Sequence, residues 1–104
     1  MAYAGKVLAQ GQLANSKTTI YTVAASTVAF IKQLRVFSTG SGQTVSIYLN
    51  PGGTSRKYAQ FVLTTGESAD VFEMPIQLEA GDLIEADSTS ATTVDYVLTG
   101  VEQT

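Results

Sequence analysis

The sequence predicts an all-β domain, a single antiparallel β-sandwich or jelly roll of about eight short strands. Runs rich in Val, Ile, Thr, Tyr and Phe recur along the chain, and turn signals containing Gly, Pro or Asn separate them. No segment carries a convincing amphipathic helix, and no internal repeat is visible. A chain of 104 residues suits one domain, so we expect a single sandwich over residues 1–104.

The first part of the chain contains three predicted strands. Residues 1–5 are weakly patterned and are expected to form a flexible N-terminal arm or an edge contact. Residues 6–14 are the first predicted strand, with a bulge at Gly11, because a glycine inside a strand often marks a bulge. Residues 18–23 form the second strand, since β-branched and aromatic side chains pack well on a pleated surface. Residues 27–38 form the third and longest strand.

The third strand has an alternative interpretation as a helix. A helical stripe would run through Val23, Thr27, Phe30, Ile31 and Leu34. The Thr, Val, Ile and Phe content of the segment favours a strand instead. Its imperfect alternation predicts one face with Phe30, Leu34 and Val36 and an opposite face with Ile31 and Phe37.

The middle of the chain alternates more regularly. Residues 44–49 predict a strand whose inner face carries Val45, Ile47 and Leu49 and whose outer face carries Ser46 and Tyr48. After the strong Asn-Pro-Gly-Gly turn at 50–53, residues 56–64 predict an inner face with Ala59, Phe61 and Leu63. The outer face of the same strand is predicted to carry Tyr58, Gln60 and Val62.

The last part of the chain adds three strands. Residues 69–74 predict a short strand that ends at Pro75. A Gly-Asp turn at 81–82 precedes a strand over residues 83–87. After a loop of small residues, residues 93–101 close the domain, with Val94, Tyr96 and Leu98 on one face.

Composition excludes several functional classes. The chain has no cysteine and no histidine, which rules out disulfides, thiolate metal sites and a histidine general base. Six basic and nine acidic residues give a net charge of −3, and only 14% of residues are charged. Such a surface suits packing against other proteins and does not suit binding a phosphate backbone. We therefore expect no enzyme activity, no cofactor and no direct contact with nucleic acid.

The sequence also lacks targeting signals. No apolar run has the length of a signal-peptide core or of a membrane span. The expectation is a protein made in a cytoplasm that does not bind a membrane and reaches its destination without standard secretion.

Two groups of acidic residues deserve a test as metal or catalytic sites. Asp82, Glu85 and Asp87 have the chemistry of a Ca²⁺ site, but their spacing matches no EF-hand loop, and Asp after Gly is ordinary turn chemistry. A second group around a turn contains Glu67, Asp70 and Glu73. A pair of carboxylates could serve glycoside hydrolysis, but no Trp or His is present to line a sugar cleft. We expect no metal and no catalytic residues.

The aromatic residues supply the remaining candidate contacts. Phe30, Phe37, Phe61 and Phe72 are predicted to lie in the core. Tyr48 and Tyr58 are predicted on outer faces, where they would stack on a sugar, anchor a subunit interface, or simply cover the sheet. Val62 is the outward apolar residue expected to be covered by a partner.

Residues 18–38 contain a Tyr-Thr-Val run, a turn of small residues and a long predicted strand. Residues 76–86 and 92–102 contain a Leu-Glu-Ala-Gly-Asp turn and a closing Gly-Val-Glu strand. These segments resemble small virion structural proteins, of the decoration or cement type, from tailed bacteriophages and prophages. The chain departs from the pattern at Ala24, where the family often has Pro, which leaves that turn less rigid.

The resemblance implies a bacteriophage capsid decoration protein that binds and stabilises the outer capsid surface, made in the host bacterial cytoplasm and located in the virion. Its partners would be the major capsid protein or other virion proteins, and it would form a homo-oligomer, with a trimer as the leading expectation. A protein of the neck, tail or fibre base is an alternative. A carbohydrate-binding jelly-roll module, with Tyr48 and Tyr58 side by side on an exposed face, is another.

Overall fold

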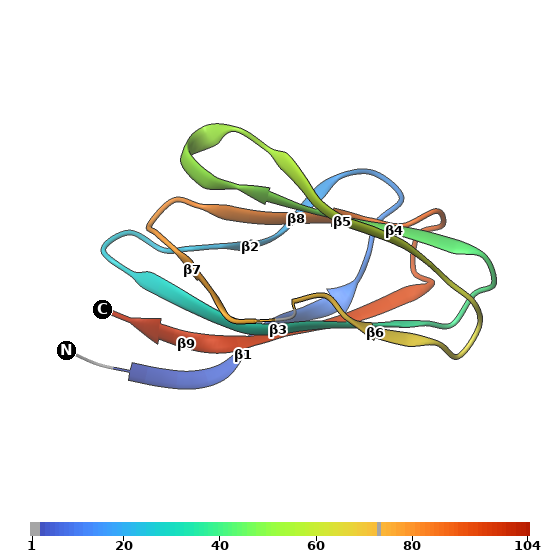
Figure 1. Ribbon diagram of the computed structural model, residues 1–104, viewed down its shortest axis with the longest axis horizontal. Helices are drawn as coiled ribbons and strands as arrows, with labels where there is room; N and C mark the ends of the chain where they lie inside the picture. The colour runs from blue at the N-terminus through green and yellow to red at the C-terminus, as the bar shows by residue number, and fades with distance from the viewer. Residues whose placement is uncertain (1–2, 73) are drawn as a thin grey trace.

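The chain folds into two antiparallel β-sheets packed face to face, which confirms the predicted sandwich (Figure 1). The computed structural model describes residues 3–72 and 74–104. One sheet has the strand order β1-β9-β3-β6, with β7 also paired to β3, and the other has the order β2-β8-β4-β5. The strands are β1 (Tyr3–Gln12), β2 (Thr18–Thr22), β3 (Val28–Ser38), β4 (Gln43–Asn50), β5 (Arg56–Leu63), β6 (Ser68–Asp70), β7 (Ile76–Leu78), β8 (Leu83–Asp87) and β9 (Val94–Gln103).

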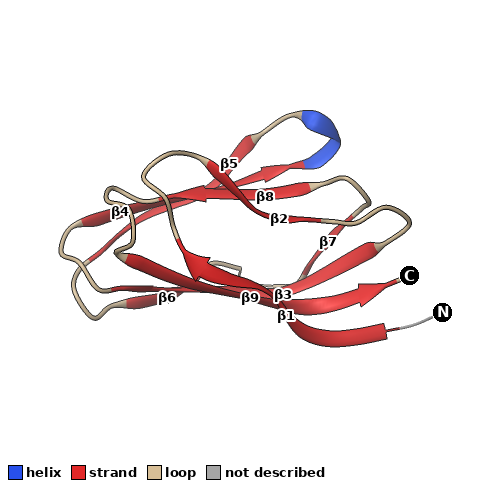
Figure 2. Cartoon of the chain, turned by 180° about the vertical axis from the view of Figure 1, so that it is seen from behind, coloured by secondary structure: helices blue, strands red, loops and turns tan. Residues whose placement is uncertain are grey.

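The turn between β4 and β5 contains the single helical element of the described residues, the 3₁₀ turn η1 (Pro51–Gly53). It projects beyond the four-stranded sheet (Figure 2). Gly52 has a φ of 68°, a left-handed conformation that glycine adopts without a steric penalty. The strong turn predicted at residues 50–53 is thus confirmed.

Strand β9 lies between β1 and β3 in the five-stranded sheet, and both of these neighbours bulge close to Thr99. The register of β1 shifts between Val7 and Ala9, and that of β3 shifts between Ile31 and Gln33. Gly100 of β9 lies beside both bulges, where a Cβ atom would sit 2.4 Å from the Phe30 carbonyl oxygen. Because glycine has no side chain, the backbones of β1, β9 and β3 can approach closely at this point.

The predicted bulge at Gly11 is therefore wrong. Gly11 pairs in register with Tyr96 of β9, and the extra residue of β1 is Leu8. A Cβ atom at Gly11 would lie 3.5 Å from the Tyr96 hydroxyl oxygen, so the tyrosine ring lies over the glycine. An aromatic side chain covering a cross-strand glycine is a different use of glycine in a strand from a bulge.

Of the two expectations for residues 1–5, a flexible arm or an edge contact, the described residues 3–5 fit the edge contact. Residues 3–5 pair with Gln103, Glu102 and Val101, at the far end of β9. Strand β9 continues to Gln103, beyond its predicted end at residue 101. Its backbone there pairs with residues 3–5, which have no clear apolar pattern of their own. The first two residues of the predicted arm lie outside the described residues.

The third strand is confirmed as a strand, but its predicted faces are wrong. Ala29 and Ile31 are buried before the bulge, and Leu34, Val36 and Ser38 are buried after it. One extra residue at Lys32 reverses the alternation, so Phe30 is only partly buried and Phe37 is 43% exposed. Phe61 is also only partly buried, so Phe72 alone of the four phenylalanines is fully in the core.

The core fills the space between the two sheets. Its buried members include, from the four-stranded sheet, Val45, Ile47, Ile84 and Ala86, and, from the other, Ile31, Leu34, Val36, Val94 and Leu98. The inward alternation predicted for β4, β5 and β9 is confirmed, since Leu63 is buried and Leu49, Ala59, Phe61 and Tyr96 pack against the core.

Tyr21 is an unpredicted member of the core. Its hydroxyl donates a hydrogen bond to Glu102 Oε2 at 2.6 Å, which joins β2 of one sheet to β9 of the other. Burial, followed by this contact with the carboxylate, raises the pKa of Tyr21 well above its ordinary value.

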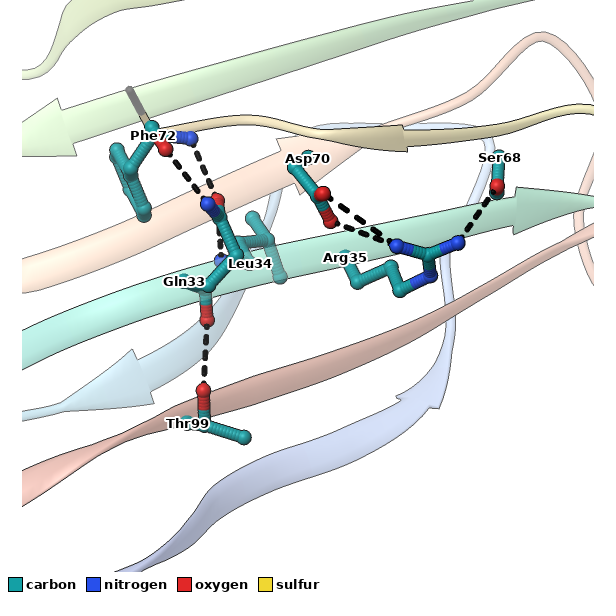
Figure 3. A network of polar contacts seen from close by, with 7 residues as sticks. All are labelled: Gln33, Leu34, Arg35, Ser68, Asp70, Phe72 and Thr99. Atoms are coloured by element: carbon teal, nitrogen blue, oxygen red, sulfur yellow. Dashed lines mark hydrogen bonds and ion pairs between the residues drawn. The ribbon is translucent and has the colours of Figure 1, made fainter. Parts of the chain in front are cut away.

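The predicted strand over residues 69–74 is shortened to β6, which ends at Asp70, and a separate strand, β7, begins after Pro75. Both β6 and β7 pair with β3. Between them the side chain of Gln33 replaces the backbone ladder (Figure 3). Gln33 Nε2 donates to the Phe72 carbonyl oxygen at 2.6 Å, and the Phe72 N–H donates to Gln33 Oε1 at 2.7 Å. Gln33 directly follows the bulge at Lys32, and its amide group supplies Phe72 with the donor and acceptor that a backbone ladder would otherwise supply.

Candidate functional site

Tyr48 lies on the outer face of β4, as predicted, but it is not an open platform. The Nζ atoms of Lys17 and Lys57 lie 4.8 Å and 5.8 Å from the centroid of its ring. Its hydroxyl donates to Asp87 Oδ2 at 3.3 Å. Cations over the ring are favourable contacts in themselves, so a sugar would have to displace them before it could stack.

Tyr58 points to a different part of the molecule from the one predicted. It is the extra residue of a bulge in β5, where the register against β4 shifts between Ile47 and Tyr48. The bulge turns the ring toward Phe72, with 5.2 Å between the two ring centroids and an angle of 57° between their planes. Tyr48 and Tyr58 thus have separate neighbours, and the paired stacking surface of a sugar-binding module is not formed.

A cleft opens beside Tyr58, where β5 faces the connection between β6 and β7. It has a volume of about 490 Å³ and is lined by Tyr58, Ala59, Val71 and Met74. Met74 is 69% exposed, so the cleft presents a flexible apolar side chain to its surroundings. Among the described lining residues, the Tyr58 hydroxyl is the only titratable group, so this part of the cleft suits contact with an apolar group.

Val62 lies further along β5, on the outer face predicted for it. It is 62% exposed and pairs with Thr44 of β4. A partner over Val62 stays a prediction.

The outer face of the five-stranded sheet carries exposed apolar residues that the sequence did not single out. Val7, Phe37 and Val97 lie on β1, β3 and β9 and are all substantially exposed. Each has a polar cross-strand neighbour, since Val7 pairs with Thr99 and Val97 pairs with Gln10 and Arg35. These residues escaped prediction because the bulges at Leu8 and Lys32, which set the faces, leave no mark in the sequence pattern.

The three acidic residues weighed as a Ca²⁺ site have separate roles. Asp82 accepts hydrogen bonds from the backbone N–H groups of Glu79 at 2.9 Å and Gly52 at 3.3 Å, so it joins two turns. Asp87 accepts from Tyr48, and Glu85 has a buried Oε1 without a hydrogen-bond partner in the structure. Among the described residues, no group of three acidic side chains is placed to hold a metal ion.

The second acidic group is equally dispersed. Glu67 accepts hydrogen bonds from the Thr64 N–H at 2.6 Å and the Thr64 hydroxyl at 2.8 Å, and these bonds lower the pKa of Glu67. Asp70 forms an ion pair with Arg35 at 3.1 Å. Glu73 lies outside the described residues.

Two glutamine side chains organise loops, and sequence reasoning missed both. Gln33 holds Phe72, as described above, and Gln43 is buried at the start of β4. Gln43 Oε1 accepts hydrogen bonds from the Ser90 N–H and the Thr93 hydroxyl, each at 2.9 Å. The available signal was a glutamine within a run of apolar, strand-forming residues, because a buried side-chain amide needs hydrogen-bond partners.

Over the described ranges, no helix is long and apolar enough to cross a membrane.

Neither a family model nor a curated protein sequence matches the chain. Its fold is similar to that of a protein from Bacillus endospore appendages, described as a novel family of disulfide-linked pili. The TM-score is 0.58 at 20% identity, over 99% of this chain and 87% of that one. It is also similar to a chain of the T13 particle of infectious bursal disease virus, with a TM-score of 0.60 at 12% identity, over 97% of this chain and 30% of that one. At these identities the likeness shows a shared fold.

Proposed function

We propose that this protein is a structural subunit of a virus particle, and specifically a capsid decoration protein of a bacteriophage that binds the outer capsid surface. The observation that carries the proposal is the fold match along nearly the whole chain to proteins that build a virus particle and an appendage. The resemblance of residues 18–38, 76–86 and 92–102 to phage decoration proteins supports the same assignment.

The surface of the sandwich suits this role. Large apolar side chains are exposed on both sheets and at the cleft, namely Val7, Phe37, Tyr58, Val62, Met74 and Val97. Exposed aromatic and methionine side chains are enriched at protein interfaces, so these side chains are available for burial by a partner. The proposal accordingly includes no enzymatic activity and no cofactor, with the major capsid protein as the partner and the capsid surface as the location.

The test is binding to capsids that lack the protein, prepared from the phage or prophage whose genome carries its gene. We expect the purified protein to sediment with these capsids and to raise the temperature at which they break open. Val62→Lys and Val97→Lys change exposed residues on opposite sheets and locate the contact face. Protein that stays in the supernatant with capsids but binds tails or necks would move the assignment to those structures. Binding to neither would overturn it.

The copy number is a separate part of the proposal. The resemblance predicts a homo-oligomer and a trimer as its leading form, and light scattering tests this against the chain mass of 11.0 kDa. A mass three times that of the chain per capsid site is the expected result.

A subunit of an extracellular filament is a second candidate, because the match to the endospore appendage protein covers nearly all of both chains. This chain has no cysteine, so filaments would have to form without disulfide links. Electron microscopy of the concentrated protein separates the two: filaments favour this candidate, and discrete particles favour the decoration protein.

A further inference from the structure

The four sheet edges differ in how well they are protected against pairing with another strand. Strand β2 has five residues and a register shift, and β6 and β7 have three residues each. Strand β5 has eight residues, but a bulge at Tyr58 interrupts it, and Arg56 and Lys57 place two positive charges at its start. Short strands, bulges and charges are the usual devices that prevent edge pairing.

Strand β1 has much less protection. It is ten residues long, and in the described part of the chain it pairs only with β9. It contains no proline and a single charged residue, Lys6, and its one device is the bulge at Leu8. Alternate residues of an edge strand direct their N–H and C=O groups away from the sheet, so a strand of this length offers a row of donors and acceptors to another strand.

We propose that β1 is a self-association edge, and that β1 of a second copy of this chain pairs with it antiparallel, with Val7 opposite Val7 at a two-fold axis. The occupant must be an extended strand, because only a strand supplies matching donors and acceptors along the whole edge. The free edges of β2, β5, β6 and β7 are blunted or short, which leaves β1 of another copy as the complementary strand within this protein. A two-fold contact between identical surfaces is also the commonest symmetry of homo-oligomers.

This register avoids a charge clash and buries an exposed apolar side chain. Pairing through Val7 places Lys6 of one copy opposite Leu8 of the other, so the two lysines are not directly opposed. Val7 is 52% exposed beside this edge, and its burial against the same residue of the second copy adds an apolar contact at the axis. The two five-stranded sheets would then form one continuous sheet across the dimer.

The test is sedimentation velocity over a concentration series in the micromolar range, on the full chain. We expect a dimer for the unchanged protein and a dimer dissociation constant about tenfold weaker or more for Val7→Lys, because two lysines then face each other at the axis. An equimolar mixture of Val7→Lys and Val7→Glu should recover the dimer. The matched control is Val62→Lys, at an exposed valine on the β5 edge (62% against 52% for Val7), which should leave the dimer intact.

Each alternative outcome overturns the proposal. A monomeric unchanged protein, a dimer or trimer unaffected by Val7→Lys, or a loss shared by Val62→Lys would each contradict it. Circular dichroism of the variants checks folding, and the charge-swap mixture keeps the test decisive if one variant is less stable. The inference does not rest on the proposed function: protein that binds capsids but fails this test would retain the decoration role and lose the two-fold contact.

Discussion

The two sides of the five-stranded sheet are built by different means. On one side, β1 follows β9 for its whole length in a backbone ladder, with a side-chain bond from Gln12 Nε2 to Asp95 Oδ1 at 3.1 Å at one end. On the other side, two three-residue strands, β6 and β7, flank a gap that the side chain of Gln33 closes by bonding to the Phe72 backbone. The backbone-built side ends in an open edge, whereas the side built by side chains is closed by a buried aromatic ring. We therefore expect most single side-chain substitutions to destabilise the β6–β7 side more than the β1 side.

The largest expected effect is at Phe72. Its side chain is 2% exposed and contacts Tyr58 across the gap between the sheets. Phe72→Ala should lower the free energy of unfolding by about 3–5 kcal/mol, since it removes a buried ring and leaves a cavity. Urea denaturation followed by circular dichroism measures the loss. The matched control is Phe37→Ala on the exposed outer face of the neighbouring β3, for which we expect less than about 1 kcal/mol. Equal losses would contradict the comparison.

One position on the backbone-built side should be comparably sensitive. Gly100→Ala places a methyl group 2.4 Å from the Phe30 carbonyl oxygen and 3.0 Å from Leu8 Cδ1. We expect a loss of about 3 kcal/mol, because backbone atoms cannot move aside as side chains can. Denaturation midpoints of the variant and of Gly40→Ala give the comparison. The new methyl group at Gly40 meets only side-chain atoms of Thr93 and Gln43, at 3.2–3.3 Å, so its cost should be smaller. A larger cost at Gly40 would be the contrary result.

The sequence predicted the regularly alternating strands well and the bulged strands poorly. The strands with regular alternation, such as β4, were predicted with their inward faces because Val45 and Ile47 repeat at the period of a strand. The bulges at Leu8 and Lys32 were not predicted, because each depends on a backbone contact with β9, which lies far along the chain. One missed bulge was enough to reverse the predicted faces of Phe30 and Phe37.

The candidate contacts show the same limit. Val62 was placed correctly, because no bulge separates it from the inward residues Phe61 and Leu63. Tyr58, four residues earlier, was misplaced, because the bulge in β5 turns its ring toward Phe72. Sequence pattern reports the local period of a strand, and it does not report the long-range register that decides where that period is interrupted.

A smaller effect than that of Phe72 is expected at Gln33. Gln33→Leu keeps the size of the side chain but leaves the N–H and C=O of Phe72 without their partners. We expect a loss of about 2–3 kcal/mol, within the cost of unsatisfied buried polar groups. Hydrogen exchange gives a local measure, since the Phe72 amide should lose protection before the amides of β9 do. The control is Thr99→Val, which removes a longer bond of 3.5 Å from Thr99 Oγ1 to the Gln33 carbonyl oxygen. Unchanged protection at Phe72 would show that Gln33 does not hold the gap closed.

The smallest effect is expected at the ion pair of Arg35 and Asp70, although it is the most visible polar contact on the same side (Figure 3). Arg35 Nη1 lies 3.1 Å from Asp70 Oδ1, and Arg35 Nη2 donates to Ser68 Oγ at 3.0 Å, so the arginine joins β3 to β6. The two side chains are 60% and 50% exposed, however, and water screens their attraction. A double-mutant cycle of Arg35→Ala and Asp70→Ala should give a coupling of about 0.5 kcal/mol or less, decreasing as salt is added. A coupling above that of the Gln33 contact would mean that surface charge, and not the side-chain amide, holds β6 against the sheet. The closed side of the sandwich would then be sensitive to ionic strength, which the open β1 side, with its backbone ladder, would not be.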